Sequence, residues 1–460
     1  MRFRTVVVAS IKSRKTECGA KWFLPRAMVR AAPFALIAAL AAGQIAVGQT
    51  IPKLTLPEAE ALALKNHPQV LAAQSEVSVA NELITEARSA YYPAVNADIT
   101  GTQGNSQARV GAGVLSASRL FDRFGQGVSV AQLVTDMGRT NNLVASTRLS
   151  AQATTQTYQA TRYDVLLQVT RSYFDVLHAQ SLVGVANQTV AARQLLLDQV
   201  TTLANNNLKS QLDVSFAGVN VSEAKLLLLR AQNSVQGAFA ELARALGSDQ
   251  PVNYALADEP LPPSPPAQAD PLIAEAMANR PELASLQFAR DAANKFAEAE
   301  KDLRHPTVTV LGVAGLLPFI NQPATGPQIP IGYEGAAVNL DIPVFNGHLF
   351  TARREAAQYR ALEADQRLRD RQQQVARDVR VAWANAVTVY QSIDVSAQFL
   401  SQASLALELS QGRYNLGLAS IVELTQAQLN VTQAEIENVD AKFDYQSQYS
   451  ALQYTLGLLR

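Results

Sequence analysis

The sequence predicts a mainly α-helical chain that is built as a tandem duplication and contributes its few strands to a membrane β-barrel. Three observations predict this class. Landmark residues recur at intervals of about 210 residues, two helical patterns each run for about 70 residues without a proline, and two short regions alternate apolar with polar residues. Each copy is therefore predicted to hold a helix, a β-hairpin, a long helix and a returning helix.

The N-terminal segment differs from the rest of the chain. Basic residues come first and an apolar run follows, which is the order of charge and hydropathy in a secretory signal peptide. We expect residues 1–48 to be a signal peptide that is cleaved after Gly48, with translation starting at Met1 or at Met28. Because Cys18 lies inside this segment, the mature chain would carry no cysteine, which suits an oxidising compartment.

Composition and charge exclude several classes of protein. With 48% hydrophobic and 17% charged residues, the chain is not disordered. The full chain has 39 basic and 39 acidic residues, and loss of the basic N-terminal segment leaves an acidic protein, which argues against nucleic acid as a partner. Scattered histidines, a single cysteine and the absence of GxxxxGK, HExxH and GxSxG patterns predict no catalytic residue, no metal site and no cofactor.

Two pairs of prolines open the two copies. Pro68 and Pro281 are 213 residues apart, and so are Pro93 and Pro306. Proline is tolerated in the first turn of a helix, where its missing N–H needs no partner, but inside a helix it breaks the pattern. These pairs predict one helix of modest length in each copy. The expected boundaries are residues 49–247 for the first copy with its helix at 68–92, and residues 272–460 for the second copy with its helix at 281–305.

Beyond each closing proline, the period of the apolar residues changes from the helical value to two. Val308 and Val310 alternate with Thr307 and Thr309, and residues 128–135 of the first copy alternate in the same way. Such strands have one apolar and one more polar face. The expected hairpins cover residues 93–137 and 306–346.

Each hairpin leads into a long helix, a short turn and a returning helix. Apolar residues fall three and four apart, and a helix of this length is about 100 Å long at 1.5 Å per residue. The expected ranges are 138–205 and 347–415 for the long helices, and 211–247 and 420–457 for the returning helices. Further landmarks match at offsets of 209 or 210 residues: Gly138 with Gly347, Phe174 with Trp383, and Asp213 with Glu423. Between the copies, the proline-rich residues 248–271 predict an extended strap.

The strands need several chains to close a barrel. Each chain offers four strands, at least about eight are needed for closure, and an open sheet would leave unpaired edges. An apolar face that alternates with a polar one is typical of a barrel with lipid outside and water inside. Together with the signal peptide, this pattern predicts an oligomer in an outer membrane.

Three segments, together with the duplicated order, carry a resemblance to a known family. They are LTLPEAEALALKNHPQV at residues 54–70, DVRVAW at 378–383 and RYNLGLASIVEL at 413–424. Over residues 52–460 the chain resembles the TolC family of outer-membrane efflux and secretion channels. The resemblance implies a homotrimer with a twelve-stranded β-barrel in the outer membrane and an α-helical barrel of twelve helices in the periplasm. It also implies a periplasmic adaptor protein, an inner-membrane pump and outer-membrane lipid as partners.

In this family, the turns between long and returning helices form the closed periplasmic end. Matched residue by residue, the resemblance implies a hydrogen-bonded gate pair at Asp213 and Tyr414. It implies pore-facing acidic positions at Glu423 and Gln426, of which the second is not acidic here, and an arginine where this chain has Ala419. The alternative is that both carboxylates only stabilise the first turn of their own helices.

The same resemblance places the contact with the adaptor at the two turns. The tip residues that it implies are Asn206, Asn207 and Leu208 in the first copy, and Leu416, Gly417 and Leu418 in the second. The alternative is that Gly417 only permits the helix to end and that the leucines cover this end.

The function that the resemblance implies is a passive exit duct for small molecules in a tripartite efflux system. Two alternatives remain open: the outer-membrane component of a type I protein secretion system, and a periplasmic helical rod without a pore. The duplicated strand pairs argue against the rod. The sequence gives no direct sign of the cargo, because the pump of such a system selects it.

Overall fold

A computed structural model gives the fold of residues 53–103, 122–250, 254–320 and 330–459. The expected signal peptide and the tips of both expected hairpins lie outside the described residues. The first copy holds β1 (Lys53–Leu54), α1 (Leu56–Asn66), α2 (Pro68–Arg88), η1 (Ser89–Tyr91), β2 (Ala94–Thr102), β3 (Arg123–Thr135), α3 (Arg139–Asn205) and α4 (Gln211–Ala245). The second copy holds β4 (Ala255–Leu256), α5 (Asp270–Asn279), α6 (Pro281–Lys301), η3 (Asp302–Arg304), β5 (Thr307–Ile320), β6 (Gly332–Asp341), α7 (Leu349–Asn415) and α8 (Ile421–Leu456).

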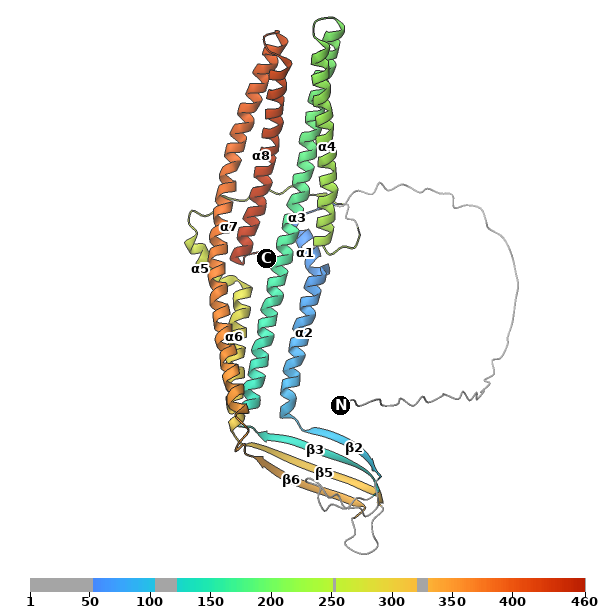
Figure 1. The fold of residues 1–460 in the computed structure, drawn as a ribbon, viewed down its shortest axis with the longest axis vertical. Helices are drawn as coiled ribbons and strands as arrows, with labels where there is room; N and C mark the ends of the chain where they lie inside the picture. The colour runs from blue at the N-terminus through green and yellow to red at the C-terminus, as the bar shows by residue number, and fades with distance from the viewer. Residues whose placement is uncertain (1–52, 104–121, 251–253, 321–329, 460) are drawn as a thin grey trace, which may run out of the picture. The chain divides into compact units, whose positions relative to one another are not determined.

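Helices α3 and α7 are the two long members of the fold, with 67 residues each. Each runs from the sheet to a distant turn (Figure 1). On the half next to the sheet, α2 packs against α3 and α6 packs against both long helices; on the other half, α4 returns along α3 and α8 along α7. The two copies contact each other through α3, which packs against α6 and α8, and through the pairing of β3 with β5. None of the described helices is long and apolar enough to cross a membrane.

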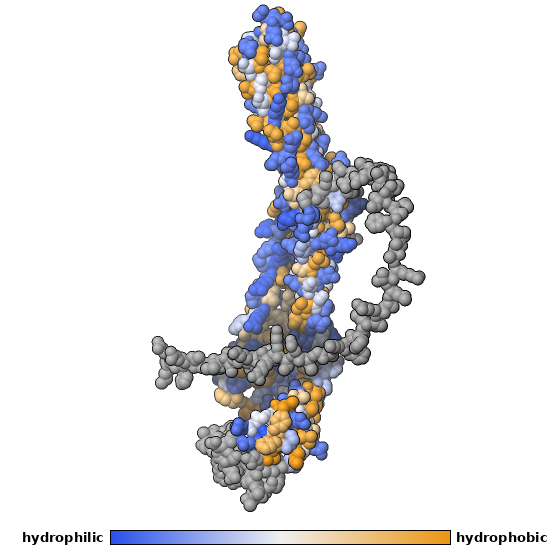
Figure 2. All heavy atoms as spheres, turned by 90° about the vertical axis from the view of Figure 1, so that its right-hand side faces the viewer, coloured by the Kyte–Doolittle hydropathy of each residue, from blue (hydrophilic) through white to orange (hydrophobic). Residues whose placement is uncertain are grey.

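The four long strands form one antiparallel sheet in the order β2-β3-β5-β6. Its register places Val95 opposite Val130 and Val310 opposite Val338 on one face, whereas Asn96 lies opposite Ser129 on the other face. The alternation read from the sequence therefore becomes an apolar and a more polar surface, and apolar side chains gather over the strands in Figure 2. Strands β2 and β6 are outermost, and each has one edge that no described strand pairs.

A sharp bend separates each sheet strand from its long helix. Two consecutive residues have positive φ angles in each copy: Met137 (56°) with Gly138 (109°), and Gly347 (60°) with His348 (68°). This left-handed conformation is strained for residues other than glycine, and each bend contains only one glycine. The sequence had suggested that Gly138 matches Gly347. The long helices begin 210 residues apart, however, so Gly138 is equivalent to His348.

Three further expectations need correction. The helices expected to end at residues 92 and 305 end at Arg88 and Lys301 and continue as single 3₁₀ turns, because the residue before a proline avoids the helical conformation. The short helices α1 and α5 were not expected; in each copy one extended residue, His67 or Arg280, separates the helix end from the proline that starts the next helix. The strap expected at residues 248–271 is shorter, because α5 begins at Asp270, and it contains β4, which pairs with β1 in parallel.

Aromatic donors hold the strap against the long helices. The buried hydroxyl of Tyr173 donates to the backbone oxygens of Leu54 (3.0 Å) and Ala257 (2.7 Å), and burial raises the pKa of Tyr173 to about 12. In the second copy, Trp383 Nε1 donates to the backbone oxygen of Pro266 at 2.8 Å. Two residues of α8 also donate to the strap: Tyr445 to Pro263 and Gln446 to Glu259. The strap is therefore fixed to both copies.

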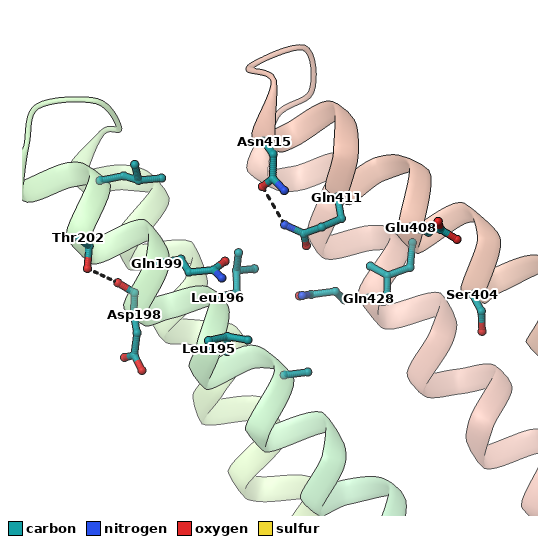
Figure 3. Close-up of a pocket in the computed structure, with 13 residues that line it drawn as sticks. Leu195, Leu196, Asp198, Gln199, Thr202, Ser404, Glu408, Gln411, Asn415 and Gln428 are labelled. Atoms are coloured by element: carbon teal, nitrogen blue, oxygen red, sulfur yellow. Dashed lines mark hydrogen bonds between the residues drawn. The ribbon is translucent and has the colours of Figure 1, made fainter.

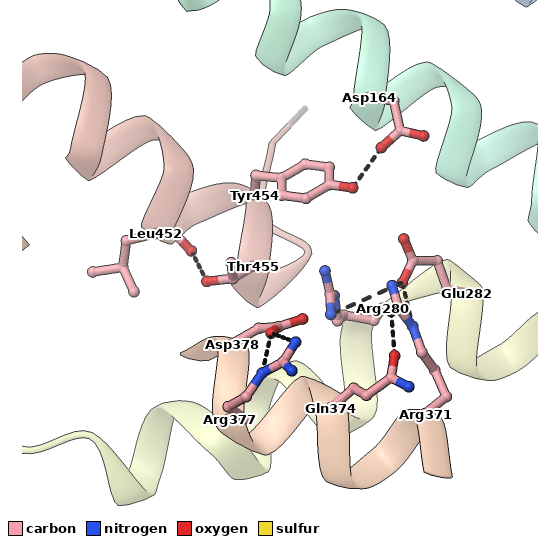
Figure 4. A network of polar contacts seen from close by, with 10 residues as sticks. All are labelled: Asp164, Arg280, Glu282, Arg371, Gln374, Arg377, Asp378, Leu452, Tyr454 and Thr455. Carbon is pink, nitrogen blue, oxygen red and sulfur yellow. Dashed lines mark hydrogen bonds and ion pairs between the residues drawn. The ribbon is translucent and has the colours of Figure 1, made fainter. Parts of the chain in front are cut away.

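A polar network joins α3, α6, α7 and α8 near the junction of α5 and α6 (Figure 4). Arg371 donates to Glu282, with Nε at 3.2 Å, and Tyr454 donates to Asp164 of α3. The guanidinium of the buried Arg280 lies 5.7 Å from the centre of the Tyr454 ring. Burial raises the pKa of Tyr454, so its hydroxyl remains a donor at neutral pH. The network adds polar links to an interface that is otherwise formed by apolar side chains.

Candidate gate and docking tip

Two turns at the far end of the helices have the same construction. In the first copy, Leu208 N donates to Leu203 O (2.9 Å) across the left-handed Asn207; in the second, Leu418 N donates to Arg413 O (2.8 Å) across the left-handed Gly417. These bonds close each helix as a Schellman motif. A serine then caps each returning helix: the hydroxyl oxygens of Ser210 and Ser420 accept from backbone N–H groups three residues later, each at 3.2 Å.

The six predicted tip residues lie on these turns and are exposed. The side chains of Leu208, Leu416 and Leu418 are 69%, 76% and 68% exposed, and Asn206 and Asn207 lie beside Leu208. A leucine covering its own helix end would be shielded from water, so the exposure argues against the covering role considered above. The fold thus presents apolar side chains at both turns, although contact with an adaptor stays a prediction.

The two carboxylates of the predicted gate are engaged within their own turns. Asp213 accepts hydrogen bonds from the backbone N–H and the hydroxyl of Ser210, both at 3.1 Å, which completes a capping box. Glu423 lies 3.3 Å from Arg413, and both side chains are largely exposed. These positions agree with the alternative that the carboxylates stabilise their own helices. Pairing of an exposed carboxylate of this kind contributes about 0–1 kcal/mol.

Tyr414 is the buried member of the predicted gate. Only 4% of its surface is exposed, and it packs in an apolar cluster with Leu196 and Val200 of α3 and Leu424 of α8. Among the described residues of the chain, its hydroxyl has no hydrogen-bond partner, so the expected bond to Asp213 is not formed here. Burial raises the pKa of Tyr414, and the negative charge of Asp213 raises it further.

A lysine that the sequence did not single out contacts this tyrosine. Lys209 belongs to the turn of the first copy, and its Nζ atom lies 4.0 Å from the centre of the Tyr414 ring. Gln426, the remaining predicted gate residue, is exposed on α8 and donates to Asn430 Oδ1 at 3.0 Å. Glu423 and Gln426 are one turn apart on the same side of α8, whereas Tyr414 points towards the first copy. The structure therefore separates the predicted gate residues: Glu423 and Gln426 are exposed on α8, Asp213 is bonded to Ser210, and Tyr414 is buried.

A groove runs between the two helix pairs close to the turns (Figure 3). Its volume is about 970 Å³. Figure 3 shows Leu195 and Gln199 of α3 facing Gln411 of α7 and Gln428 of α8 across it. The Gln428 Oε1 atom is buried and has no hydrogen-bond partner among the described residues. The groove thus offers a mixture of apolar and amide groups.

A buried polar chain crosses from the first helix pair to the second below the turns. Arg193 of α3, 5% exposed, donates through Nη1 to the backbone oxygen of Asn220 at 3.0 Å. The Asn220 amide donates to Thr425 Oγ1 of α8, also at 3.0 Å. Arg193 also lies 3.6 Å from Glu223, and burial lowers its pKa. We call Arg193, Asn220 and Thr425 the polar clasp; sequence patterns gave no sign of it, because its members come from three helices.

Comparisons with known proteins agree with this architecture. A family model described as outer membrane efflux protein matches residues 61–248 and again residues 272–458, one match for each copy. Outer membrane protein TolC of Escherichia coli (strain K12) is 23% identical over 405 residues, covering 86% of this chain and 80% of that protein. Outer membrane efflux protein BepC of Brucella suis is 23% identical over 409 residues, covering 88% and 86%.

Solved structures share the fold at low identity. The CmeC outer membrane channel of Campylobacter jejuni superposes with a TM-score of 0.75 at 15% identity, covering 87% of this chain and 85% of that one. The resemblance read from the sequence, the mainly helical duplicated fold and the location in the outer membrane are confirmed. The chain belongs to the outer membrane efflux protein family.

Proposed function

We propose that the protein is the outer-membrane channel of a tripartite efflux system, a passive trimeric exit duct for small molecules. The main observation behind this proposal is that the sheet, which has an apolar face, leads directly into the two long helices. Each of these helices is 67 residues long. At 1.5 Å per residue, each long helix extends about 100 Å from the sheet. A wall of this kind can lead from an outer membrane to partners in the periplasm. The proposal assigns no catalytic residue and no cofactor.

The unpaired parts of one chain support assembly with further copies. Strands β2 and β6 each have an edge that no described strand of the chain pairs, and three copies would supply twelve strands for a closed barrel without edges. Apolar side chains are also exposed along one side of α4, at Leu212, Phe216, Val219 and Leu226, and along α7, at Val395, Phe399, Leu405 and Leu409. Such rows are stabilised when a neighbouring copy covers them, by about 1.5–3 kcal/mol for each side chain that becomes fully buried.

We infer that the turns form the periplasmic aperture and that their exposed leucines bind the adaptor protein. In a trimer, three Glu423 carboxylates would surround the opening and favour cations over anions, although pairing with Arg413 reduces their field. Replacement of Glu423 by Gln is then expected to lower the ratio of cation to anion permeability, whereas Gln426→Ala is not. An unchanged ratio in Glu423→Gln would place the ring elsewhere.

The function can be tested in the membrane and in bilayers. Outer-membrane extracts are expected to contain a heat-modifiable trimer, and the purified trimer should form channels in planar bilayers. Host cells that lack their own outer-membrane efflux channel should accumulate less dye when they express this chain with its adaptor and pump. A soluble periplasmic protein that forms no channel would instead support the rod without a pore.

A further inference from the structure

We propose that Lys209 holds the two helix pairs of one chain together through a cation–π contact with the ring of Tyr414, and that this contact keeps the aperture closed. The proposal rests on the channel function proposed above and deepens its gate. It differs from the gate implied by the family resemblance, because the ring and not the hydroxyl of Tyr414 makes the decisive contact.

The geometry of the contact supports this assignment. The Nζ atom of Lys209 lies 4.0 Å from the ring centre, well inside the distance of about 6 Å at which a cation is attracted by an aromatic face. Tyr414 is 4% exposed and Lys209 is half-buried, so water screens the attraction only in part. The remaining surface of the ring packs against the apolar cluster formed with Leu196 and Leu424. A contact in such surroundings is stronger than one on an open surface.

The hydroxyl of Tyr414 has no comparable link. It is buried without a hydrogen-bond partner among the residues that the structure describes. The carboxylate of Asp213 instead accepts two hydrogen bonds from Ser210. Asp213 is still close enough to affect the charge balance, because it contributes to the raised pKa of Tyr414. Removal of the hydroxyl alone therefore leaves the contact with Lys209 intact.

The contact joins the two copies, and neither of its two residues is repeated at the equivalent position of the other copy. The turns are 210 residues apart, so Lys209 is equivalent to Ala419 and Tyr414 to Ala204. Alanine offers neither a charge nor a ring. The first turn thus supplies the cation and the second turn supplies the aromatic face. Any movement of α7 and α8 away from α3 and α4 separates these two groups, so the contact opposes an opening of the aperture.

Four variants of the full-length trimer test the proposal by single-channel recording. Lys209→Met keeps the length of the side chain but removes the charge, and Tyr414→Leu removes the ring. For each subunit that loses the contact, the ratio of open to closed times is expected to rise by about 2- to 30-fold, the range that corresponds to one cation–π contact. Lys209→Arg and Tyr414→Phe preserve cation and ring, and both should behave as wild type. Lys225→Met, at an exposed lysine of α4, is the matched control.

The outcomes separate failure of the contact from failure of the channel. If the double variant Lys209→Met with Tyr414→Leu opens no more often than either single variant, the two residues act as one unit, as proposed. If Tyr414→Phe opens as often as Tyr414→Leu, the hydroxyl is the gate and the proposal is wrong. If Lys209→Met equals Lys225→Met in a conducting wild-type background, Lys209 has no gating role. Absence of conductance in the wild type would overturn the channel function itself.

Discussion

The helices of the two copies have nearly equal lengths, whereas many of their side chains differ. Helices α3 and α7 have 67 residues each, and α2 and α6 have 21. Each copy ends on a left-handed glycine, Gly247 or Gly457, that rests on the backbone between the two short helices of its copy. At both of these glycines, backbone meets backbone. Such contacts leave no room for variation, whereas side-chain contacts can be exchanged.

The junction between the short helices illustrates the exchange. In the first copy, the Nδ1 atom of the buried His67 accepts a hydrogen bond from Gln69 N at 3.3 Å. In the second copy, the equivalent residue is Arg280, whose guanidinium lies over the Tyr454 ring. A similar change affects the strap, which is held by Tyr173 in one copy and Trp383 in the other. Equivalent backbone positions therefore carry different side-chain contacts. The same holds at the two turns, where one copy supplies Lys209 and the other supplies Tyr414.

The largest effect is expected at the terminal glycines. A Cβ atom at Gly247 would lie 2.7 Å from His67 Cα, and one at Gly457 would lie 2.9 Å from Asn279 O, in addition to the strain of a positive φ angle. Either glycine changed to Ala should cost more than about 3 kcal/mol and greatly reduce the yield of trimer. Gly184→Ala is the control, because its Cβ would meet no described atom within 4 Å beyond the backbone of its own helix, and alanine favours the helix. A stable Gly457→Ala trimer would show that the backbone contact at Gly457 does not restrict the second copy as the contact at Gly247 restricts the first.

The aromatic donors of the strap provide the next comparison. Tyr173→Phe leaves the buried backbone oxygen of Ala257 without this donor, and we expect a loss of about 1–3 kcal/mol. Trp383→Phe removes an exposed hydrogen bond and should cost less, about 0.5–1 kcal/mol. Denaturant unfolding of the purified trimer measures both. Equal losses would contradict the view that burial makes the two donors different.

The polar clasp tests the contact between the copies. Thr425→Val keeps the shape of the side chain but leaves the buried amide of Asn220 without its acceptor, which should destabilise the trimer by about 1–2 kcal/mol. The matched control is Thr432→Val, because the hydroxyl of Thr432 donates within α8, to Gln428 O, and has no other hydrogen-bond partner among the residues that the structure covers. The two melting temperatures give the comparison. A shift of equal size in both variants would assign no special role to the clasp.

The smallest expected effect is a pH dependence that belongs to the first copy alone. Burial lowers the pKa of His67 below its usual 6.5, and the charge of Arg244 lowers it further. Because the unfolded chain binds this proton more readily, the contribution of His67 is complete above about pH 7 and declines as the pH falls below 6.5. His67→Asn keeps a capping side chain without a titrating group, so stability should fall less between pH 7 and 5. An identical pH profile in both proteins would exclude His67 as the cause.

Much of this fold could be predicted from the sequence because duplication repeats its strongest signals. Prolines at equal offsets fixed the starts of α2 and α6, and period-two alternation located the strands. The short helices α1 and α5 were missed because a segment of about 10 residues has a weak periodic pattern. Phe174 was matched to Trp383, yet both long helices begin 210 residues apart, which makes Tyr173 the equivalent residue. One residue of misalignment was enough to hide a shared donor to the strap.

The candidate site was predictable in place and less so in chemistry. Both turns could be located, since a glycine or asparagine between two helical patterns marks a helix end. The contact between Lys209 and Tyr414 could not, because it joins turns that are about 200 residues apart in the sequence and meet only in the folded chain. The sequence held one sign of it: when the two copies are aligned, the lysine and the tyrosine each match an alanine in the other copy.

The outer edges of β2 and β6, which pair with no strand in the described part of the chain, have a genetic consequence under the proposed trimer. A subunit whose β6 edge is blocked would still offer an intact β2 edge to a neighbour, and so would enter a ring that it cannot complete. With random mixing at equal expression, only about one ring in eight would consist entirely of intact subunits. Such alleles should therefore be dominant negative, whereas alleles that prevent folding should be recessive.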